Sequence, residues 1–224
     1  MVELQYFGNS FFTIKDNKAL VVIDPIFGFS DKQMKKKVVA AKMSDMKGAA
    51  VILLTNELPE HFDKDLVERI ALEENATVLA HDSILKQLSL PRSQKIPIQA
   101  NSEFCIKGFK IKTTTAHFPK SFYPLGYIVE CSGKRVYHAG VTALLDTFSS
   151  IKVDVALLPI SDRSMDIIDA VRATKLMKPK TVIPMQYDIY DSGKNDPKEL
   201  KRRIEESVLA TETVILSPGK KMKF

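Results

Sequence analysis

The segment VILLTNELPEHF, residues 51–62, passes from an unbroken apolar run directly into a loop of polar side chains. Its first four residues are apolar on both faces, which is typical of a strand buried in a sheet that helices cover. Three other runs rich in β-branched residues have the same pattern, at residues 19–23, 153–158 and 181–185. We therefore expect a sheet of buried strands, with residues 50–54 among them, and helices packed against it.

Polar segments follow these and neighbouring runs at the points where the strands should end. They are Asp24, residues 55–61, Ala116 with His117, residues 137–140, Ser161 with Asp162, and residues 186–188. In sheets flanked by helices, ligands bind in the loops beyond the strand ends. We therefore expect these loops to share one cleft.

Three segments carry the signals of amphipathic helices. Asp196, Pro197 and Glu199 provide, in order, an N-cap, a first-turn proline and a capping acid, and apolar residues recur every four positions behind them. A second helix is predicted to open at Ser164 and Asp166. The predicted helices occupy residues 197–208, residues 164–178 and a stretch that starts near residue 63.

Between residues 104 and 137 the pattern changes to shorter segments with turn signals. Ser132 and Gly133 separate two strand-like runs, residues 126–131 and 134–138, and this arrangement predicts a hairpin. The expected fold class is therefore α/β with a large antiparallel component.

The chain has 224 residues, of which 45% are hydrophobic. This length and composition predict one globular domain that spans residues 1–224. Cys105 and Cys131 are too few to staple a chain of this length, and each is expected to behave as a small hydrophobic residue. No apolar run reaches the ~20 residues that a bilayer span needs, and the first residues lack a signal-peptide pattern. We therefore expect a cytoplasmic protein with no membrane partner.

The formal net charge of +6 could suit an anionic partner. The basic residues, however, form short clusters without the interleaved aromatic side chains of a nucleic-acid stacking platform. Solvated surface explains these clusters more simply. The sequence therefore argues against a nucleic-acid partner.

Segments along most of the chain match, in the same order, the motifs of one protein family. Residues 21–25, VVIDP, are similar to its LIDP strand, and residues 51–62 are similar to its ILLTHGHGDHF segment. The other matches are residues 124–129 with 134–140 (PLGYVI and KRIYHAGDT), 156–160 with 164–166 (ALLPIGG and TMD), and 178–185 (KPKVVIPMHY). The chain thus resembles the metallo-β-lactamase fold, in the branch of small metal-dependent hydrolases similar to L-ascorbate-6-phosphate lactonase. This resemblance implies an αββα sandwich, in which two mixed β-sheets pack face to face and helices flank them.

The resemblance also implies one or two divalent metals, held by a His-x-His-x-Asp-His motif, a later His, a bridging Asp and a last His. This chain has Asn56, Leu58, Glu60 and His61 at the motif positions, followed by His117, Val141 and Gln186. His61 and His117 keep the family's residue, and Glu60 is a conservative exchange. A catalytic zinc site needs three protein ligands with nitrogen, oxygen or sulfur donors, and Leu58 and Val141 offer none. We therefore expect the two-metal hydrolase site to be lost.

A single metal site could still be rebuilt from the remaining residues. Glu60, His61, His117 and Gln186 are its candidate ligands, and one Zn²⁺ or Mn²⁺ ion is the candidate cofactor. The first three of these are also the catalytic candidates. If no such site forms, no cofactor is expected, and the two histidines are hydrogen-bonded residues of the cleft.

Three further residues that line the expected cleft have structural interpretations. Asp24, which precedes Pro25, is expected to anchor loop backbone, and Asp162 to cap the helix that follows it. His138 corresponds to a position that binds no metal in the family that the chain resembles, so a structural role is expected for it.

The expected cleft has no metal at its centre, and this fixes how its polar groups must pair. A buried polar group without a partner costs ~1–3 kcal/mol, so we expect Glu60 to pair with a neighbouring histidine, backbone or water. His61, His117 and Gln186 are expected to converge in one partly open pocket. Leu58 and Val141 are expected to form its apolar wall.

Two functions from different classes follow from these residues. The first is a binding or regulatory protein that keeps the fold and cleft of a hydrolase but has impaired or absent catalysis. The alternative is a hydrolase of lactones or phosphoesters that uses the rebuilt single-metal site. Nucleic-acid binding through the basic surface is a third and weaker hypothesis. The expected ligand is an unidentified small molecule, and the sequence leaves a homo-oligomer open.

Overall fold

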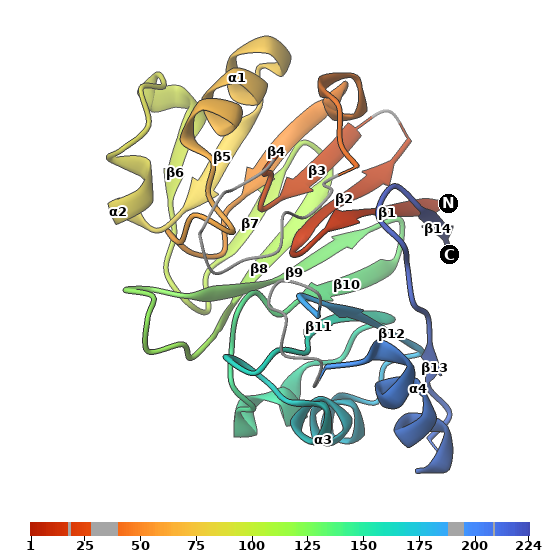
Figure 1. The fold of residues 1–224 in the computed structure, drawn as a ribbon. Coiled ribbons are helices and arrows are strands. Elements are labelled where there is room, and N and C mark those ends of the chain that lie inside the picture. The colour runs from red at the N-terminus through yellow and green to blue at the C-terminus, as the bar shows by residue number, and fades with distance from the viewer. Residues whose placement is uncertain (18, 28–39, 188–194, 208) are drawn as a thin grey trace.

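The computed structural model describes residues 1–17, 19–27, 40–187, 195–207 and 209–224. Two β-sheets pack face to face, and helices lie on the outer sides of both (Figure 1). This is the αββα sandwich that the sequence predicted. In chain order the elements, with η for 3-10 helices, are β1 (Val2–Gly8), β2 (Phe11–Asp16), β3 (Ala19–Ile23), η1 (Met43–Met46), β4 (Ala49–Leu53), α1 (Lys64–Glu74), β5 (Thr77–Ala80), α2 (Asp82–Leu85), η2 (Arg92–Gln94), β6 (Lys95–Pro97), β7 (Glu103–Ile106), β8 (Phe109–Thr115), β9 (Leu125–Cys131), β10 (Lys134–His138), η3 (Asp146–Ser150), β11 (Val155–Pro159), α3 (Ile167–Met177), β12 (Thr181–Met185), α4 (Pro197–Glu206), β13 (Glu212–Thr213) and β14 (Lys221–Lys223).

Each sheet has seven strands, divided into an antiparallel and a parallel half. The first sheet has the order β14-β1-β2-β3-β4-β5-β6, with antiparallel pairs from β14 to β3 and parallel pairs from β3 to β6. The second sheet has the order β13-β12-β11-β10-β9-β8-β7, with parallel pairs from β13 to β10 and antiparallel pairs from β10 to β7. The large antiparallel component expected from the sequence is therefore present in both sheets.

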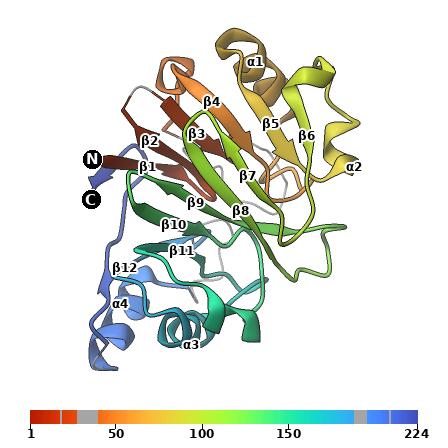
Figure 2. The same cartoon turned by 180° about the vertical axis from the view of Figure 1, so that it is seen from behind.

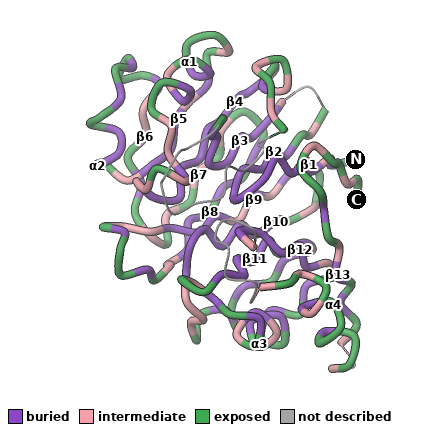
Figure 3. Tube along the Cα trace, in the orientation of Figure 1, coloured by how far each residue is buried: buried purple, intermediate pink, exposed green. Residues whose placement is uncertain are grey.

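The apolar runs of the sequence form the central strands. Strands β3 and β12 have the predicted bounds, whereas β4 and β11 are shifted by one or two residues. Strands β4 and β11 are buried along their whole length, and β3 and β12 are buried except at their first residues, Ala19 and Thr181 (Figure 3). Side chains on both faces are buried because one face meets the other sheet and the other face meets helices.

The three predicted amphipathic helices are α1, α3 and α4. Asp63, Asp166 and Asp196 cap them, each accepting a hydrogen bond from a backbone N–H in the first turn. The expectation that Asp162 caps α3 is therefore wrong, because Asp166 stands directly before the first helical residue. The predicted end of α4 at Val208 lies outside the described residues. None of the described helices is long and apolar enough to cross a membrane.

The helices divide between the two sheets (Figure 2). Leu66, Val67 and Ile70 of α1 belong to an apolar cluster with strands of the first sheet. The buried sides of α3 and α4 join the larger core that lies between the sheets and beneath the second one. Strands β9 and β10 form the predicted hairpin, in which Ser132 and Gly133 have φ angles of 45° and 69°. Two successive left-handed residues are what a tight two-residue hairpin turn requires.

Candidate functional site

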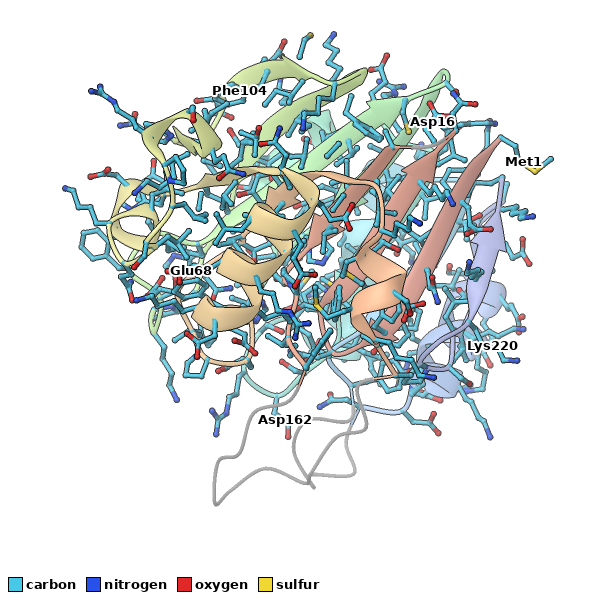
Figure 4. The ribbon with its side chains drawn as sticks, turned by 90° about the horizontal axis from the view of Figure 1, so that it is seen from above. Met1, Asp16, Glu68, Phe104, Asp162 and Lys220 are labelled. Carbon is cyan, nitrogen blue, oxygen red and sulfur yellow. The ribbon has the colours of Figure 1, made fainter. Side chains whose placement is uncertain are left out.

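The loops after β3, β4, β10 and β12 are joined at one edge of the sandwich, and the turn between β1 and β2 connects them. Three hydrogen bonds link these segments: Thr55 N–H to Asp24 Oδ1 at 2.8 Å, Gln186 N–H to Asn9 O at 3.2 Å, and His138 Nε2 to Ser10 O at 2.9 Å. Leu125 N–H at the start of β9 also bonds to Thr55 O at 2.8 Å. Figure 4 places Asp162, in the loop after β11, at the opposite end of the molecule from Asp16. Loops from both sheets therefore build one shared region.

Asp24 is the centre of the hydrogen bonding in this region. It is fully buried, and its backbone has a left-handed φ of 49°, which aspartate tolerates better than most residues. Its Oδ1 accepts the N–H of Thr55 at 2.8 Å, and its Oδ2 accepts the hydroxyl of Thr55 at 2.6 Å. Oδ2 also lies 2.7 Å from Nδ1 of His61. The carboxylate thus ties the loop after β4 to the end of β3.

His61 is 2% exposed, and its orientation is set by Asp24. Because a carboxylate only accepts, Nδ1 of His61 carries the hydrogen and donates it, which leaves Nε2 as the ring nitrogen without a partner among the described residues. Ser10 Oγ lies 3.0 Å from the same Nδ1. A Ser-His-Asp triad needs the serine on the opposite ring nitrogen, so this cluster is not a triad.

Glu60 does not have the role that the sequence suggested. The acidic partner of His61 is Asp24. Of the partners expected for the Glu60 side chain, a histidine, backbone or water, His61 is therefore not the one, and pairing with water stays a prediction. The half-buried Glu60 is held through its backbone carbonyl, which accepts Asn9 Nδ2–H at 2.6 Å. Asp24 is the carboxylate that pairs with His61 because it is fully buried at the strand end and its Oδ2 lies 2.7 Å from His61 Nδ1.

His138 makes a hydrogen bond through each of its ring nitrogens. Gly140 N–H donates to its Nδ1 at 3.1 Å, so the ring hydrogen is on Nε2 and is donated to Ser10 O. Complete burial lowers the pKa of His138, and the nearby charge of Asp24 opposes that shift only in part. The uncharged ring therefore joins the loop after β10 to the turn between β1 and β2.

The amides at the two positions where the resemblance implies histidine hold loop segments. Asn56 Oδ1 accepts Leu58 N–H at 3.0 Å, and Asn56 Nδ2 donates to Thr55 Oγ1 at 3.0 Å. Gln186 Nε2 donates to Gly140 O at 3.3 Å, which joins the loop after β12 to the loop after β10. Asn56 therefore stabilises its own loop, whereas Gln186 links two loops.

The remaining candidates vary in exposure. His117 is exposed, and its backbone bonds to Thr142 Oγ1 and Ala143 N–H. Val141 is 5% exposed and Leu58 is half-buried. Asp162 is exposed and accepts a hydrogen bond from Asn195 Nδ2 at 2.9 Å. That the side chains of His61, His117 and Gln186 converge in one pocket stays a prediction.

The donor chemistry of this region does not fit a two-metal centre. Across the described ranges, no three His, Cys, Asp or Glu side chains are grouped so that they could hold a metal ion. Glu60, His61 and His117 therefore do not form such a group. The carbonyl oxygen of Asn56 is already occupied by a backbone N–H. A single ion would need the amide of Gln186 as a third ligand, and an amide oxygen is a poor donor for zinc.

Sequence reasoning missed Asn9 and Ser10. Both are fully buried, and both contact the loop that carries His61. Asn9 Oδ1 has no hydrogen-bond partner among the residues that the structure describes. The one signal in the sequence is that this polar pair follows Gly8 in a turn between two strongly apolar strands. Turn residues of this kind are usually exposed, so their burial was not expected.

Comparison with known proteins agrees with this architecture. The sequence model of the Beta-lactamase superfamily domain matches residues 3–186. A UPF0173 metal-dependent hydrolase from Pelotomaculum thermopropionicum is 30% identical over 238 residues, which cover 99% of this chain and 100% of that protein. The structure of Igni18, a metallo hydrolase from Ignicoccus hospitalis, has a TM-score of 0.80 and 27% identity over 100% of this chain and 99% of the other. The metallo-beta-lactamase fold protein YhfI from Bacillus subtilis has a TM-score of 0.77 at 13% identity, over 99% and 98% of the two chains.

The fold and these matches define a metallo-β-lactamase-fold protein. Within that class, the chain belongs to the UPF0173 metal-dependent hydrolase family.

Proposed function

We propose that this chain is a member of the metal-dependent hydrolase family that has lost the two-metal centre and acts as a binding or regulatory protein. Its ligand would be a small molecule held in the region built around Asp24 and His61. The observation that carries this proposal is the replacement of metal-ligand chemistry by hydrogen bonds and apolar side chains. Asn56 bonds to its own loop, Gln186 bonds to the loop after β10, and the side chains of Leu58 and Val141 carry no donor atom for a metal.

One observation favours a competing function, a hydrolase with a single metal ion. Asp24 holds Nδ1 of His61 and leaves Nε2 available, which is the arrangement that carboxylates give to metal-binding histidines. The family name, metal-dependent hydrolase, agrees with that function. The available donors argue against a metal site. His61 is the one histidine held in this way among the described residues, and no group of three His, Cys, Asp or Glu side chains forms there that could hold an ion.

The metal content of the purified chain separates these two functions. The protein is dialysed against Zn²⁺ and then Mn²⁺, the free ion is removed, and the bound metal is measured by mass spectrometry. We expect well below about one ion per chain, and no metal-dependent turnover of lactones or phosphoesters. About two tightly held ions per chain would contradict the proposal. About one ion, lost together with turnover in His61→Ala, would establish the single-metal hydrolase.

A matched variant tests the physical reason for the loss. The variant restores the family's ligands with Asn56→His, Leu58→His, Glu60→Asp, Val141→Asp and Gln186→His. If the replaced side chains are the cause, a folded form of this variant binds metal where the natural chain does not. Equal metal content in the two proteins would show that the exchanged positions do not control metal binding.

A further inference from the structure

A groove lies on the outer face of the antiparallel half of the second sheet, and its described lining includes none of the residues of the Asp24–His61 region. Its volume is about 470 Å³. Lys110, Lys112 and Thr114 of β8 form part of its floor, and they alternate with residues that face the core. Residues 147–152 form one wall. Helix α3 packs against η3, which contributes to this wall, and α4 packs against β13 at the other end of the sheet (Figure 2).

The lining of the groove has an excess of two positive charges. Its cationic side chains are Lys110, Lys112, Arg135 and Lys152, and its carboxylates are Glu103 and Glu130. Glu103 pairs with Lys112 at 3.1 Å, and this partner lowers the pKa of Glu103. In the strand register, Glu130 stands between Lys110 and Arg135. Neither of those two cations, nor Lys152, forms a salt bridge within the described part of the chain.

A second groove provides a comparison within the same molecule. It lies on the first sheet and has a volume of about 600 Å³. Its charged residues are Lys15, Lys47 and Lys221 with Glu3, Asp45 and Glu74, so its charges balance. Glu3 pairs with Lys221 at 2.9 Å. A positive excess is thus a property of the groove on the second sheet and not of every exposed sheet face in this protein.

The floor of the positively charged groove is closed around Thr114. Thr114 is 8% exposed, and its hydroxyl oxygen is buried. The buried hydroxyl of Tyr137 lies beside it. Gly126 faces Thr114 across the strand pair, and a Cβ at Gly126 would lie 2.5 Å from Thr114 Oγ1. The floor is therefore packed at this point, and the accessible polar groups of the groove include its charged side chains and Asn101.

We propose that this groove binds a small phosphate monoester that carries hydroxyl groups. A phosphate monoester has a charge near −2 at neutral pH, which matches the excess charge of the lining. Lysine and arginine form strong, charge-assisted hydrogen bonds to phosphate oxygens. The exposed amide of Asn101 provides a neutral partner for a hydroxyl group of the ligand. This site is independent of the function proposed for the Asp24–His61 region.

Titration by NMR of the full, ¹⁵N-labelled chain tests the proposal. The probes are glycerol 3-phosphate and inorganic phosphate, and glycerol is the neutral control. We expect saturable shifts for glycerol 3-phosphate confined to residues 110–115, 126–135 and 147–152, and an affinity that falls as salt increases. Glycerol is expected to produce no saturable shift. Shifts centred on residues 55–61, or no saturable shift, would overturn the proposal.

Matched substitutions separate this site from general attraction of anions. Lys110→Gln with Arg135→Gln is expected to weaken binding about tenfold or more, because two charge-assisted contacts are lost. Lys15→Gln with Lys47→Gln removes the same charge from the balanced groove and is expected to change the dissociation constant less than about twofold. Equal weakening by the two double variants would overturn the proposal.

Discussion

Replacing Asp24 by asparagine isolates the hydrogen bonds that organise the candidate site. Asparagine has nearly the same shape and tolerates the left-handed φ of 49°, so the backbone strain changes little. The Oδ1 atom keeps the N–H of Thr55. The Oδ2 atom becomes an NH₂ group, which cannot accept a hydrogen bond from Thr55 Oγ1 or from His61 Nδ1.

The expected loss follows from the number and kind of these bonds. Hydrogen bonds to a charged group contribute about 1.5–3 kcal/mol each, and Asp24 is fully buried, so solvent does not weaken them. Asp24→Asn removes one acceptor atom, Oδ2, and with it two hydrogen bonds, but His61 can recover part of the loss by moving its hydrogen to Nε2 and accepting from the new amide. We therefore expect the free energy of unfolding to fall by about 2–4 kcal/mol.

Urea unfolding measures this change, and Asp16→Asn is the matched control. The side chain of Asp16 accepts a hydrogen bond from the exposed Ser132, so its exchange is expected to cost less than about 0.5 kcal/mol. The midpoint of Asp24→Asn should fall while the slope of the transition stays constant. A loss below about 1 kcal/mol, or one equal to that of Asp16→Asn, would refute the view that this carboxylate organises the site.

Three further predictions concern groups around the site and in the second sheet. Burial lowers the pKa of His138 in the folded chain, so the unfolded chain takes up the proton more readily and stability should fall as pH drops below about 6.5. Urea unfolding at pH 7.5 and 5.5 measures this, and His138→Gln should reduce the difference in stability between the two pH values. An unchanged difference in the variant would contradict the role given to His138. Burial raises the pKa of Cys131 to about 11, whereas Cys105 is exposed. Iodoacetamide at neutral pH should therefore react with Cys105 first, and mass spectrometry measures the extent of labelling at each cysteine. Comparable labelling of both in the folded protein would be inconsistent with a buried Cys131 thiol. Gly140 has a φ of 67°, and a Cβ there would lie 2.5 Å from Leu125 O, whereas Gly133 has a φ of 69° and nothing within 4 Å of its Cβ position. Gly140→Ala should therefore lower the free energy of unfolding by at least about 2 kcal/mol more than Gly133→Ala. Equal losses would show that the backbone at Leu125 moves to accommodate the added Cβ.

The fold was predictable because its signals are local. Apolar runs with fixed ends, such as residues 19–23 and 181–185, form β3 and β12 with the predicted bounds. Asp63, Asp166 and Asp196 are caps that the pattern around each helix identifies. Resemblance to a known family added the pairing of the sheets, which periodicity alone does not determine.

The pairing of polar groups in the site was not predictable to the same degree. Asp24 and His61 are 37 positions apart, and Glu60, directly beside His61 in the sequence, was the more obvious partner. Side-chain direction after a strand depends on the turn geometry, here residues 58–62, where His61 N–H and Phe62 N–H both bond to Leu58 O. Asn9 and Ser10 were missed because burial of a polar turn depends on the loops that cover it, and those come from distant parts of the chain.

We propose that His61 and its neighbours form a hydrogen-bonded network and not a metal site. A crystal structure of the chain grown with Zn²⁺, with anomalous scattering recorded at the zinc edge, tests this directly. We expect no anomalous peak within coordination distance of His61 Nε2, and Nδ1 of His61 bonded to Asp24. A strong peak about 2.0–2.1 Å from His61 Nε2, with at least two further protein ligands, would contradict it.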